Sequence, residues 1–167
     1  MIACVLPKKV FANHKLMLSD LRRSKISKPI LLFCCAVLNS FTFDFLIRQR
    51  VSATISMFIF FQLPIPRLTE QTPDFTPIMI RAAKLICTTP EFDELARESS
   101  LGSYESGATD PAERSRLRAE LDGLTAHLYG LTEEEFAYIL STFPLVPDPV
   151  KVAAQNAYRD VERGLIT

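Results

Sequence analysis

The stretch from residue 38 to residue 66 constrains the fold most strongly, because it is the most apolar and aromatic part of the chain. It ends abruptly at Pro64 and Pro66. Any hydrophobic core must be built on these residues. The chain has 167 residues, of which 48% are hydrophobic and 23% charged. This composition predicts a folded protein with the size of one ordinary domain.

A long apolar helix is predicted from residue 29 to residue 47, where apolar residues recur at steps of three and four. Ser27 or Lys28 is expected to precede it as the N-cap, since proline is favoured in the first turn of a helix. Arg48 stands near its C-terminal end, where positive charge suits the helix dipole. Asp44 is expected to act as a cap, to pair with Arg48 or to bond the backbone.

Three short apolar runs predict buried strands. Residues 2–6 form the first run, which Pro7 ends. Residues 8–18 are expected to return as a second strand after a turn at Asn13, giving a hairpin. Residues 57–63 are predicted to form a third, buried strand.

The rest of the chain favours helices. Residues 77–86 and 90–95 are expected to be helical, with Thr76 capping the first of these helices. Residues 99–109 contain two glycines and four serines and predict a flexible loop or linker. Capping patterns at Asp110, Thr132 and Asp148 then predict three consecutive helices, which form a compact unit.

These elements predict an α+β fold in three segments. Residues 1–72 form a basic, apolar α/β segment, in which short N-terminal strands pack with the long apolar helix. Residues 73–109 form a helical connection and a flexible loop. Residues 110–167 form an acidic, helix-rich C-terminal unit of three helices.

The net charge of zero hides an asymmetry between the two parts of the chain. Residues 1–66 hold nine Lys/Arg and two Asp/Glu, a balance of +7, whereas residues 67–167 hold ten and seventeen, a balance of −7. This asymmetry indicates that the first part meets a polyanion, or that the two parts meet each other or another subunit. Two solvated surfaces of opposite bias remain an alternative.

Motifs that would signal catalysis are absent from the sequence. There is no glycine-rich phosphate loop, no HExxH and no GxSxG. The cysteines have no metal-binding spacing, so we expect that there is no metal site and that the thiols are free. Free thiols fit a reducing, cytoplasmic location. No signal peptide is expected, because the apolar stretch of residues 2–6 is too short for one. His127 is expected to be a structural residue on a helix surface or partly buried. His14 is expected to be a solvated turn residue.

Several stretches together resemble the C-terminal region of adenine-N6 DNA methyltransferases of type II and type IIG restriction–modification systems, which contains a TaqI-like specificity domain for target recognition. The resemblance covers nearly the whole chain, and the order of the stretches agrees with the family. We name them the family stretches: Ile2-Ala3-Cys4-Val5-Leu6-Pro7; residues 38–45 with Arg48-Gln49-Arg50; residues 58–66 with Gln62-Leu63-Pro64-Ile65-Pro66; and residues 117–143 with Ala119-Glu120-Leu121-Asp122-Gly123-Leu124 and Tyr129-Gly130-Leu131.

In the family, an upstream domain binds S-adenosylmethionine and transfers the methyl group through an Asn-Pro-Pro-Tyr motif. That motif does not occur here, so no catalytic or cofactor-binding residue is carried over. The resemblance therefore implies a fragment that is not catalytic alone. Its expected partners are double-stranded DNA and a methyltransferase catalytic domain or subunit.

DNA contacts are expected mainly from the basic residues of the first part, which would bind phosphates and position the chain. Asn13 and Gln62 are candidates for reading bases. The candidate DNA-binding residues are Lys8, Lys9, Asn13, Lys15, Arg22, Arg23, Lys25, Lys28, Arg48, Arg50 and Gln62.

Two other functions fit the sequence. One is a structural or subunit-assembly module that does not bind DNA, in which the basic surface meets an acidic partner. The other is a small membrane-associated protein, because residues 29–47 are mostly apolar and long enough to span a bilayer. Asp44 lies within that span and would be costly in lipid, so no membrane partner is expected.

Overall fold

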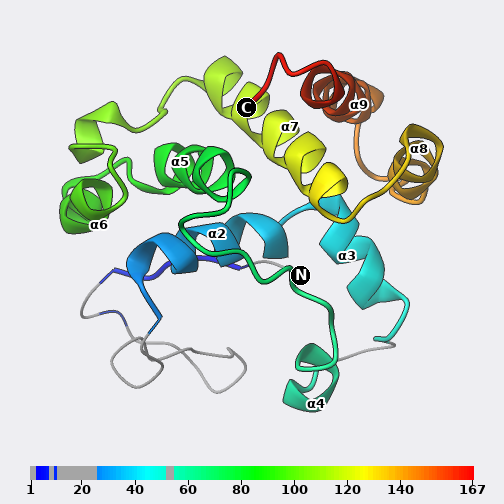
Figure 1. The fold of residues 1–167 in the computed structure, drawn as a ribbon, viewed down its shortest axis with the longest axis horizontal. Coiled ribbons are helices and arrows are strands. Elements are labelled where there is room, and N and C mark those ends of the chain that lie inside the picture. The colour runs from blue at the N-terminus through cyan, green and yellow to red at the C-terminus, as the bar shows by residue number, and fades with distance from the viewer. Residues whose placement is uncertain (1–2, 8–9, 11–25, 52–54) are drawn as a thin grey trace.

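The computed structural model describes residues 3–7, 10, 26–51 and 55–167, and these residues form a helical assembly. In Figure 1, α7 runs through the middle of the assembly, α5 and α6 lie to one side of it, α8 and α9 lie to the other, and α4 stands apart. The elements are α2 (Lys28–Leu38), α3 (Phe41–Arg48), α4 (Met57–Phe60), α5 (Phe75–Ile86), η1 (Pro90–Phe92), α6 (Asp93–Glu98), η2 (Tyr104–Ser106), α7 (Pro111–Leu128), α8 (Glu133–Ser141) and α9 (Asp148–Glu162).

The predicted α+β class is wrong, because the described residues contain no strand. Ala3 instead bonds Asn39, which directly follows α2. The N–H of Ala3 donates to Asn39 Oδ1 at 3.0 Å, and the carbonyl of Ala3 accepts from Asn39 Nδ2 at 2.8 Å. An asparagine amide therefore satisfies the groups that a strand partner would satisfy. Of the predicted return strand, residues 8–18, all but Val10 lie outside the described residues.

The predicted strand at residues 57–63 is also wrong, since this run contains helix α4. Ser56 Oγ accepts a hydrogen bond from the N–H of Ile59 at 3.3 Å and so caps the helix. Only Leu63 in the run is buried. The periodicity of a short apolar run does not distinguish a helix from a strand, and here the cap favours the helix.

The predicted long apolar helix is two helices, α2 and α3, bent by 65°. Polar side chains at the break end one helix and start the next. Asn39 Nδ2 donates to the carbonyl of Cys35 at 2.8 Å, and Ser40 Oγ accepts from the N–H of Phe43 at 3.2 Å. A serine that caps α3 within the apolar run thus divides it.

Other local predictions for this region are confirmed. Ser27 is the N-cap of α2, and its Oγ accepts from the N–H of Ile30 at 3.4 Å. Asp44 pairs with Arg48, with 2.7 Å between Oδ2 and Nη2. No single helix in the described part of the chain is long and apolar enough to cross a membrane, and only the bent pair of α2 and α3 has the required length and composition.

The three helices predicted for the C-terminal end are present as α7, α8 and α9. Asp110 Oδ2 caps α7 by accepting from the N–H of Glu113 at 2.8 Å. Thr132 and Glu135 form the predicted reciprocal capping box at the start of α8, with bonds of 3.2 and 2.8 Å. Helix α5 begins at Phe75, ahead of the cap that was expected at Thr76.

One hydrophobic core joins α2, α3, α5, α6 and α7, so it draws on all three sequence segments. A smaller cluster joins α7, α8 and α9. The largest fully buried side chains are the four rings of Phe33, Phe43, Phe75 and Phe136, packed with aliphatic residues. The apolar stretch therefore supplies only part of the core, and the helices after residue 73 supply the rest.

Helices α7 and α9 approach closely at Gly123. A Cβ atom on Gly123 would lie 2.7 Å from the backbone nitrogen of Tyr158, so only glycine fits there. One helical turn later, His127 Nε2 lies 2.9 Å from the carbonyl oxygen of Tyr158, and the two rings stack with centroids 4.1 Å apart. His127 is partly buried and joins two helices, as expected for a structural residue.

Residues 99–109, predicted to be a flexible loop or linker, pack against the end of α5. The N–H of Ala108 donates to the carbonyl of Lys84 at 2.8 Å, and Arg114 Nη1 donates to the carbonyl of Ala108 at 2.7 Å. Ser99 and Ala108 are buried. Gly107 lies so close to Cys87 that an added Cβ would be 2.0 Å from its carbonyl oxygen.

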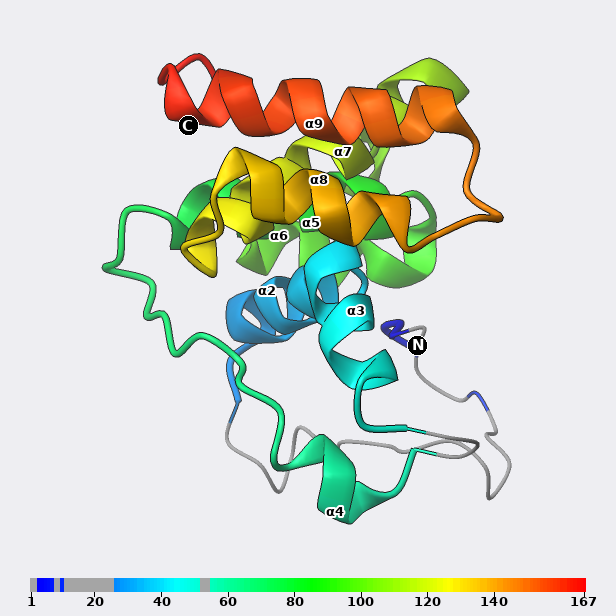
Figure 2. The ribbon, with the colours of Figure 1, turned by 90° about the vertical axis from the view of Figure 1, so that its right-hand side faces the viewer.

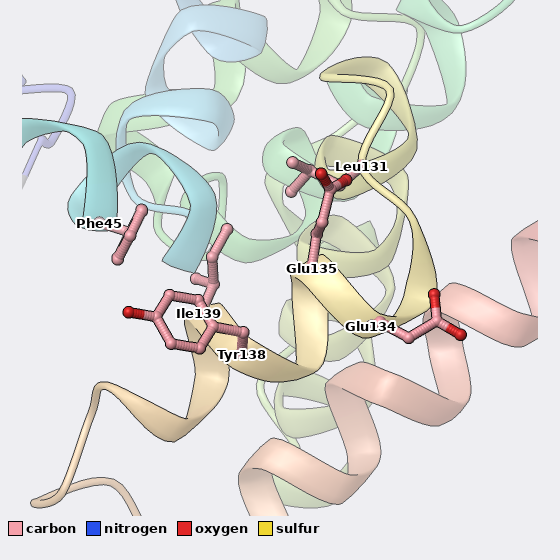
Figure 3. A pocket seen from close by; sticks show the side chains of 6 residues that line it. All are labelled: Phe45, Leu131, Glu134, Glu135, Tyr138 and Ile139. Carbon is pink, nitrogen blue, oxygen red and sulfur yellow. The ribbon is translucent and has the colours of Figure 1, made fainter.

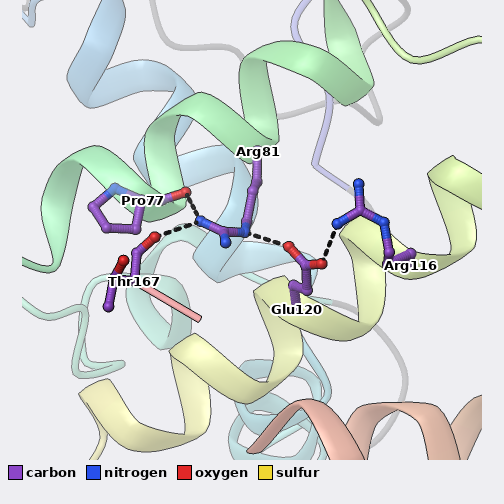
Figure 4. A network of polar contacts seen from close by, with 5 residues as sticks. All are labelled: Pro77, Arg81, Arg116, Glu120 and Thr167. Carbon is purple, nitrogen blue, oxygen red and sulfur yellow. Dashed lines mark hydrogen bonds and ion pairs between the residues drawn. The ribbon is translucent and has the colours of Figure 1, made fainter. Parts of the chain in front are cut away.

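A largely buried ion pair connects α5 and α7. Arg81 Nε donates to Glu120 Oε2 at 2.6 Å, and the two side chains are only 16% and 9% exposed. Arg81 Nη1 also donates to the carbonyl of Pro77 at 3.0 Å and to the main-chain oxygen of Thr167 at 3.4 Å. Glu120 accepts in addition from the more exposed Arg116 on its own helix (Figure 4).

Candidate nucleic-acid interface

The family stretches lie far apart in the sequence and contact one another in the structure. The first stretch meets the second through the bonds of Ala3. The second meets the fourth where the N–H of Phe41 donates to Asp122 Oδ1 at 2.9 Å and where the rings of Phe41 and Phe143 pack with centroids 4.9 Å apart. The third meets the fourth where Tyr129 donates its hydroxyl proton to the carbonyl of Pro64 at 2.7 Å. All four stretches therefore belong to one structural unit.

Asp122 is the polar centre of this unit. Its side chain projects from α7 and accepts the hydrogen bond of Phe41, the first residue of α3. Burial raises the pKa of Asp122 to about 7, and the hydrogen bond from Phe41 opposes this rise. The carboxyl group therefore titrates near neutral pH, in the contact between two of the family stretches.

We expect replacement of Asp122 by asparagine to change how stability depends on pH. The pKa is higher in the folded chain than the ordinary value of about 3.9, so the contribution of Asp122 to stability is complete below about pH 4 and is lost as the pH rises through about 7. Asparagine keeps an oxygen that accepts the N–H of Phe41 and carries no charge. The variant should match the wild type near pH 4 and exceed it near pH 8 by an amount on the order of 4 kcal/mol, since the two pKa values differ by about three and each pKa unit corresponds to about 1.4 kcal/mol.

Urea unfolding followed by circular dichroism across this pH range measures the difference between the two proteins. Other groups titrate equally in both proteins and cancel in that difference. A difference that does not vary with pH would show that Asp122 is not held at a raised pKa.

Lys28, one of the predicted DNA contacts, forms two ion pairs in the structure. Its Nζ lies 2.6 Å from Glu94 Oε1 and 2.7 Å from Glu98 Oε1, so it ties α2 to α6. Partial burial disfavours the charged amine, but the hydrogen bonds to Glu94 and Glu98 outweigh this effect and raise the pKa of Lys28. Lys28 therefore carries its charge within a cluster of partly exposed, oppositely charged side chains.

The other described candidates lie around the end of α3 and the segment after it. Arg48 pairs with Asp44 and holds its guanidinium 4.4 Å from the ring centroid of Phe143. Arg50 and Gln62 are exposed, and no ion pair within the described ranges engages Arg50. The candidates that lie outside the described residues are Lys8, Lys9, Asn13, Lys15, Arg22, Arg23 and Lys25.

An exposed apolar surface on α4 was missed by sequence reasoning. Met57 is 49% exposed, Phe58 74% and Phe61 75%. We call these three side chains the α4 surface. Residues 57–63 contain three phenylalanines, and the buried strand predicted for this run placed them in the core.

A shallow pocket of about 390 Å³ lies between α3 and α8, on the acidic side of the molecule. Figure 3 shows the ring of Phe45 facing Tyr138 and Ile139, with Leu131 and two glutamates completing the lining. The glutamates are Glu134 and Glu135, and the second is engaged in the capping box of α8. The pocket combines an apolar floor with negative charge, a combination that is unfavourable for phosphate.

Reactive chemistry is not concentrated anywhere in the described ranges. They hold no group of three or more histidine, cysteine or acidic side chains that could bind a metal ion. Burial raises the pKa of both Cys35 and Cys87 to about 11, which keeps these thiols protonated and unreactive.

No known protein family, curated protein or solved structure matches the chain. The resemblance to adenine-N6 DNA methyltransferases remains a prediction from the family stretches.

Proposed function

We propose that this chain is the DNA target-recognition part of a site-specific adenine-N6 DNA methyltransferase of a restriction–modification system. It is not catalytic alone, and methyl transfer belongs to a separate catalytic domain or subunit that binds S-adenosylmethionine. The observation that carries the proposal is the convergence of the family stretches, which are colinear with the family in sequence and contact one another through Asn39, Asp122 and Tyr129.

The distribution of charge supports this proposal. Residues 45–69 contain three arginines and no carboxylate, whereas α8 begins with three glutamates. In Figure 2, α4 lies at one end of the molecule and α9 at the other, with α8 beneath it. DNA is expected at the end with α4 and the C-terminal end of α3, and a protein partner is expected near α8.

Binding of the purified chain to a short labelled duplex at several salt concentrations tests the proposal. The logarithm of the affinity should fall linearly with the logarithm of the salt concentration, because each phosphate contact releases counterions. We expect Arg50→Gln to weaken binding and to reduce the size of this slope by about one, since Arg50 is exposed and free to contact a phosphate.

The matched control is Arg118→Gln, which removes the same charge from an exposed position on α7. It should leave the slope unchanged, because α7 is not part of the expected DNA surface. An equal effect of the two substitutions would mean that binding follows net charge and not this surface. Absence of binding by the wild type at low salt would contradict the proposal itself.

A subunit-assembly module that does not bind DNA is the second candidate, and the pocket between α3 and α8 favours it. Tyr138 at this pocket is 64% exposed, and Leu145 in the following loop is 96% exposed. Exposed apolar side chains of this size are typical of protein–protein contacts. A chain that binds no DNA at low salt would be assigned to this function.

A further inference from the structure

The pocket between α3 and α8 has an apolar floor that belongs to the packed structure. Ile139 is buried and Leu131 is partly buried, and both side chains line the pocket. The rings of Phe41 and Phe143, with centroids 4.9 Å apart, hold the start of α3 against the residues that follow α8. The floor is therefore preformed, which lowers the entropy cost of binding a partner.

Two aromatic rings stand above this floor. Phe45 on α3 and Tyr138 on α8 meet edge to face, with ring centroids 6.2 Å apart and an interplanar angle of 81° (Figure 3). Tyr138 is nevertheless 64% exposed, so most of its surface is open to solvent. Tyrosines are enriched among the residues that contribute most to protein–protein binding.

The charged residues at the pocket are acidic. Residues 128–147 include three glutamates and no lysine or arginine. Glu133 pairs with Arg159 on α9 at 2.6 Å, whereas Glu134 and Glu135 are exposed and form no ion pair within the described ranges. The positive end of α8 offsets only about half an elementary charge. The two exposed glutamates that line the pocket therefore give it a net negative field.

The hydroxyl group of Tyr158 indicates that this field reaches the floor of the pocket. It donates to the carbonyl of Leu131 at 2.7 Å, so it lies directly behind a lining residue. Burial raises the pKa of Tyr158, and the charges of Glu162 and the three glutamates of α8 raise it further. Carboxylates from two helices thus act together at this position.

These features select among possible occupants. Nucleic acid and anionic membranes carry phosphates, which the glutamates repel. A small molecule binds best in a site that encloses most of its surface, and this pocket is shallow. A cationic protein segment complements both features, because an apolar side chain covers the floor and a lysine or arginine meets the carboxylates.

We propose that the pocket between α3 and α8 binds a cationic segment of a partner protein. A large apolar side chain of that segment contacts Phe45 and Tyr138, and an adjacent lysine or arginine pairs with Glu134. This inference rests on one part of the proposed function, the expectation of a protein partner near α8, and does not require DNA binding. It adds the chemistry of the partner and the side chains that bind it.

The experiment selects short random peptides displayed on phage, with the purified wild-type chain as the target. The enriched peptides should carry a large apolar residue next to lysine or arginine. The most enriched peptide is then labelled and its affinity measured by fluorescence anisotropy. Tyr138→Ala should weaken its binding by about 10- to 30-fold, as expected for a tyrosine at the centre of a contact. Glu134→Gln should weaken it by about 2- to 5-fold, as expected for an exposed ion pair.

Matched variants separate this pocket from general effects. Glu105→Gln removes the same charge as Glu134→Gln, but from the loop that packs against the end of α5, and it should bind like the wild type. Tyr138→Phe keeps the ring and should also bind like the wild type. Since Glu134 and Tyr138 are exposed, thermal unfolding of their variants should match that of the wild type. Equal losses for Glu134→Gln and Glu105→Gln would mean that binding follows net charge, and the inference would be wrong.

The remaining outcomes are also decisive. The inference is wrong if no peptide is enriched, if the enriched peptides lack basic residues, or if they bind Tyr138→Ala as tightly as the wild type. Self-association of the wild type that Tyr138→Ala abolishes would assign the pocket to a second copy of the chain and overturn the inference. Duplex binding without peptide binding removes the inference alone, and peptide binding without duplex binding removes only the proposal that the chain recognises DNA.

Discussion

Replacing Glu120 by alanine is expected to lower the free energy of unfolding by about 3–5 kcal/mol. Glu120 is the anion that neutralises the largely buried guanidinium of Arg81, at 2.6 Å. Removing one partner of a buried ion pair leaves the other charge desolvated and unpaired. Urea unfolding followed by circular dichroism measures the change, and for a chain of this size the melting temperature should fall by roughly 10 °C.

The position of Arg116 provides a matched control. It contacts the same carboxylate as Arg81, but its side chain is 60% exposed. Exposed ion pairs contribute little, so Arg116→Ala should cost less than about 1 kcal/mol. A double variant, Arg81→Met/Glu120→Leu, should be much less destabilised than Glu120→Ala, because it removes both charges together. Equal losses for Glu120→Ala and Arg116→Ala would contradict this account.

The elements that the sequence predicted correctly are those that local hydrogen bonds define. Ser27, Asp110 and Thr132 each accept the N–H of the third residue after them, so their effect is contained within a few residues. Pairing of Asp44 with Arg48 is equally local. Such contacts can be predicted from spacing alone, since a helix brings residues three and four apart together.

The prediction of the fold class was wrong at positions where local patterns conflict. The apolar spacing through residues 29–47 predicted one helix, yet Ser40 also has the position of an N-cap and in the structure divides the run. The run after Ser56 is short and apolar, and its periodicity suits either a helix or a strand. In both places a serine caps a helix within the apolar run, and the hydrophobic pattern does not reveal that cap.

The candidate interface depends on contacts that no local pattern contains. Lys28 was a reasonable phosphate contact by charge, but the fold places Glu94 and Glu98 beside it from a distant part of the sequence. The contact of Phe41 with Asp122 likewise joins distant positions. The exposure of Phe58 likewise depends on the fold and could not be predicted from the family stretches.

We expect Gly107→Ala, in the loop of residues 99–109, to lower the free energy of unfolding strongly. An added Cβ would lie 2.0 Å from the carbonyl oxygen of Cys87 and 2.8 Å from its carbonyl carbon. Both are backbone atoms at the end of α5, so no side chain can turn aside to make room. The loop must move away, and the bond from the N–H of Ala108 to the carbonyl of Lys84 is then weakened or lost. We expect a loss of about 3 kcal/mol in the free energy of unfolding, measured by urea titration.

Gly102→Ala in the same loop is the control that separates contact from backbone conformation. Gly102 has φ +88° with no atom within 4 Å of an added Cβ, so alanine there costs only conformational strain, about 1 kcal/mol. Gly107 has φ −69°, which any residue adopts, so the whole effect of an alanine there is steric. A smaller loss at Gly107 than at Gly102 would show that the loop moves freely, as its glycine and serine content had predicted. The larger loss that we expect would show that close packing against Cys87, which composition does not reveal, holds this loop in place.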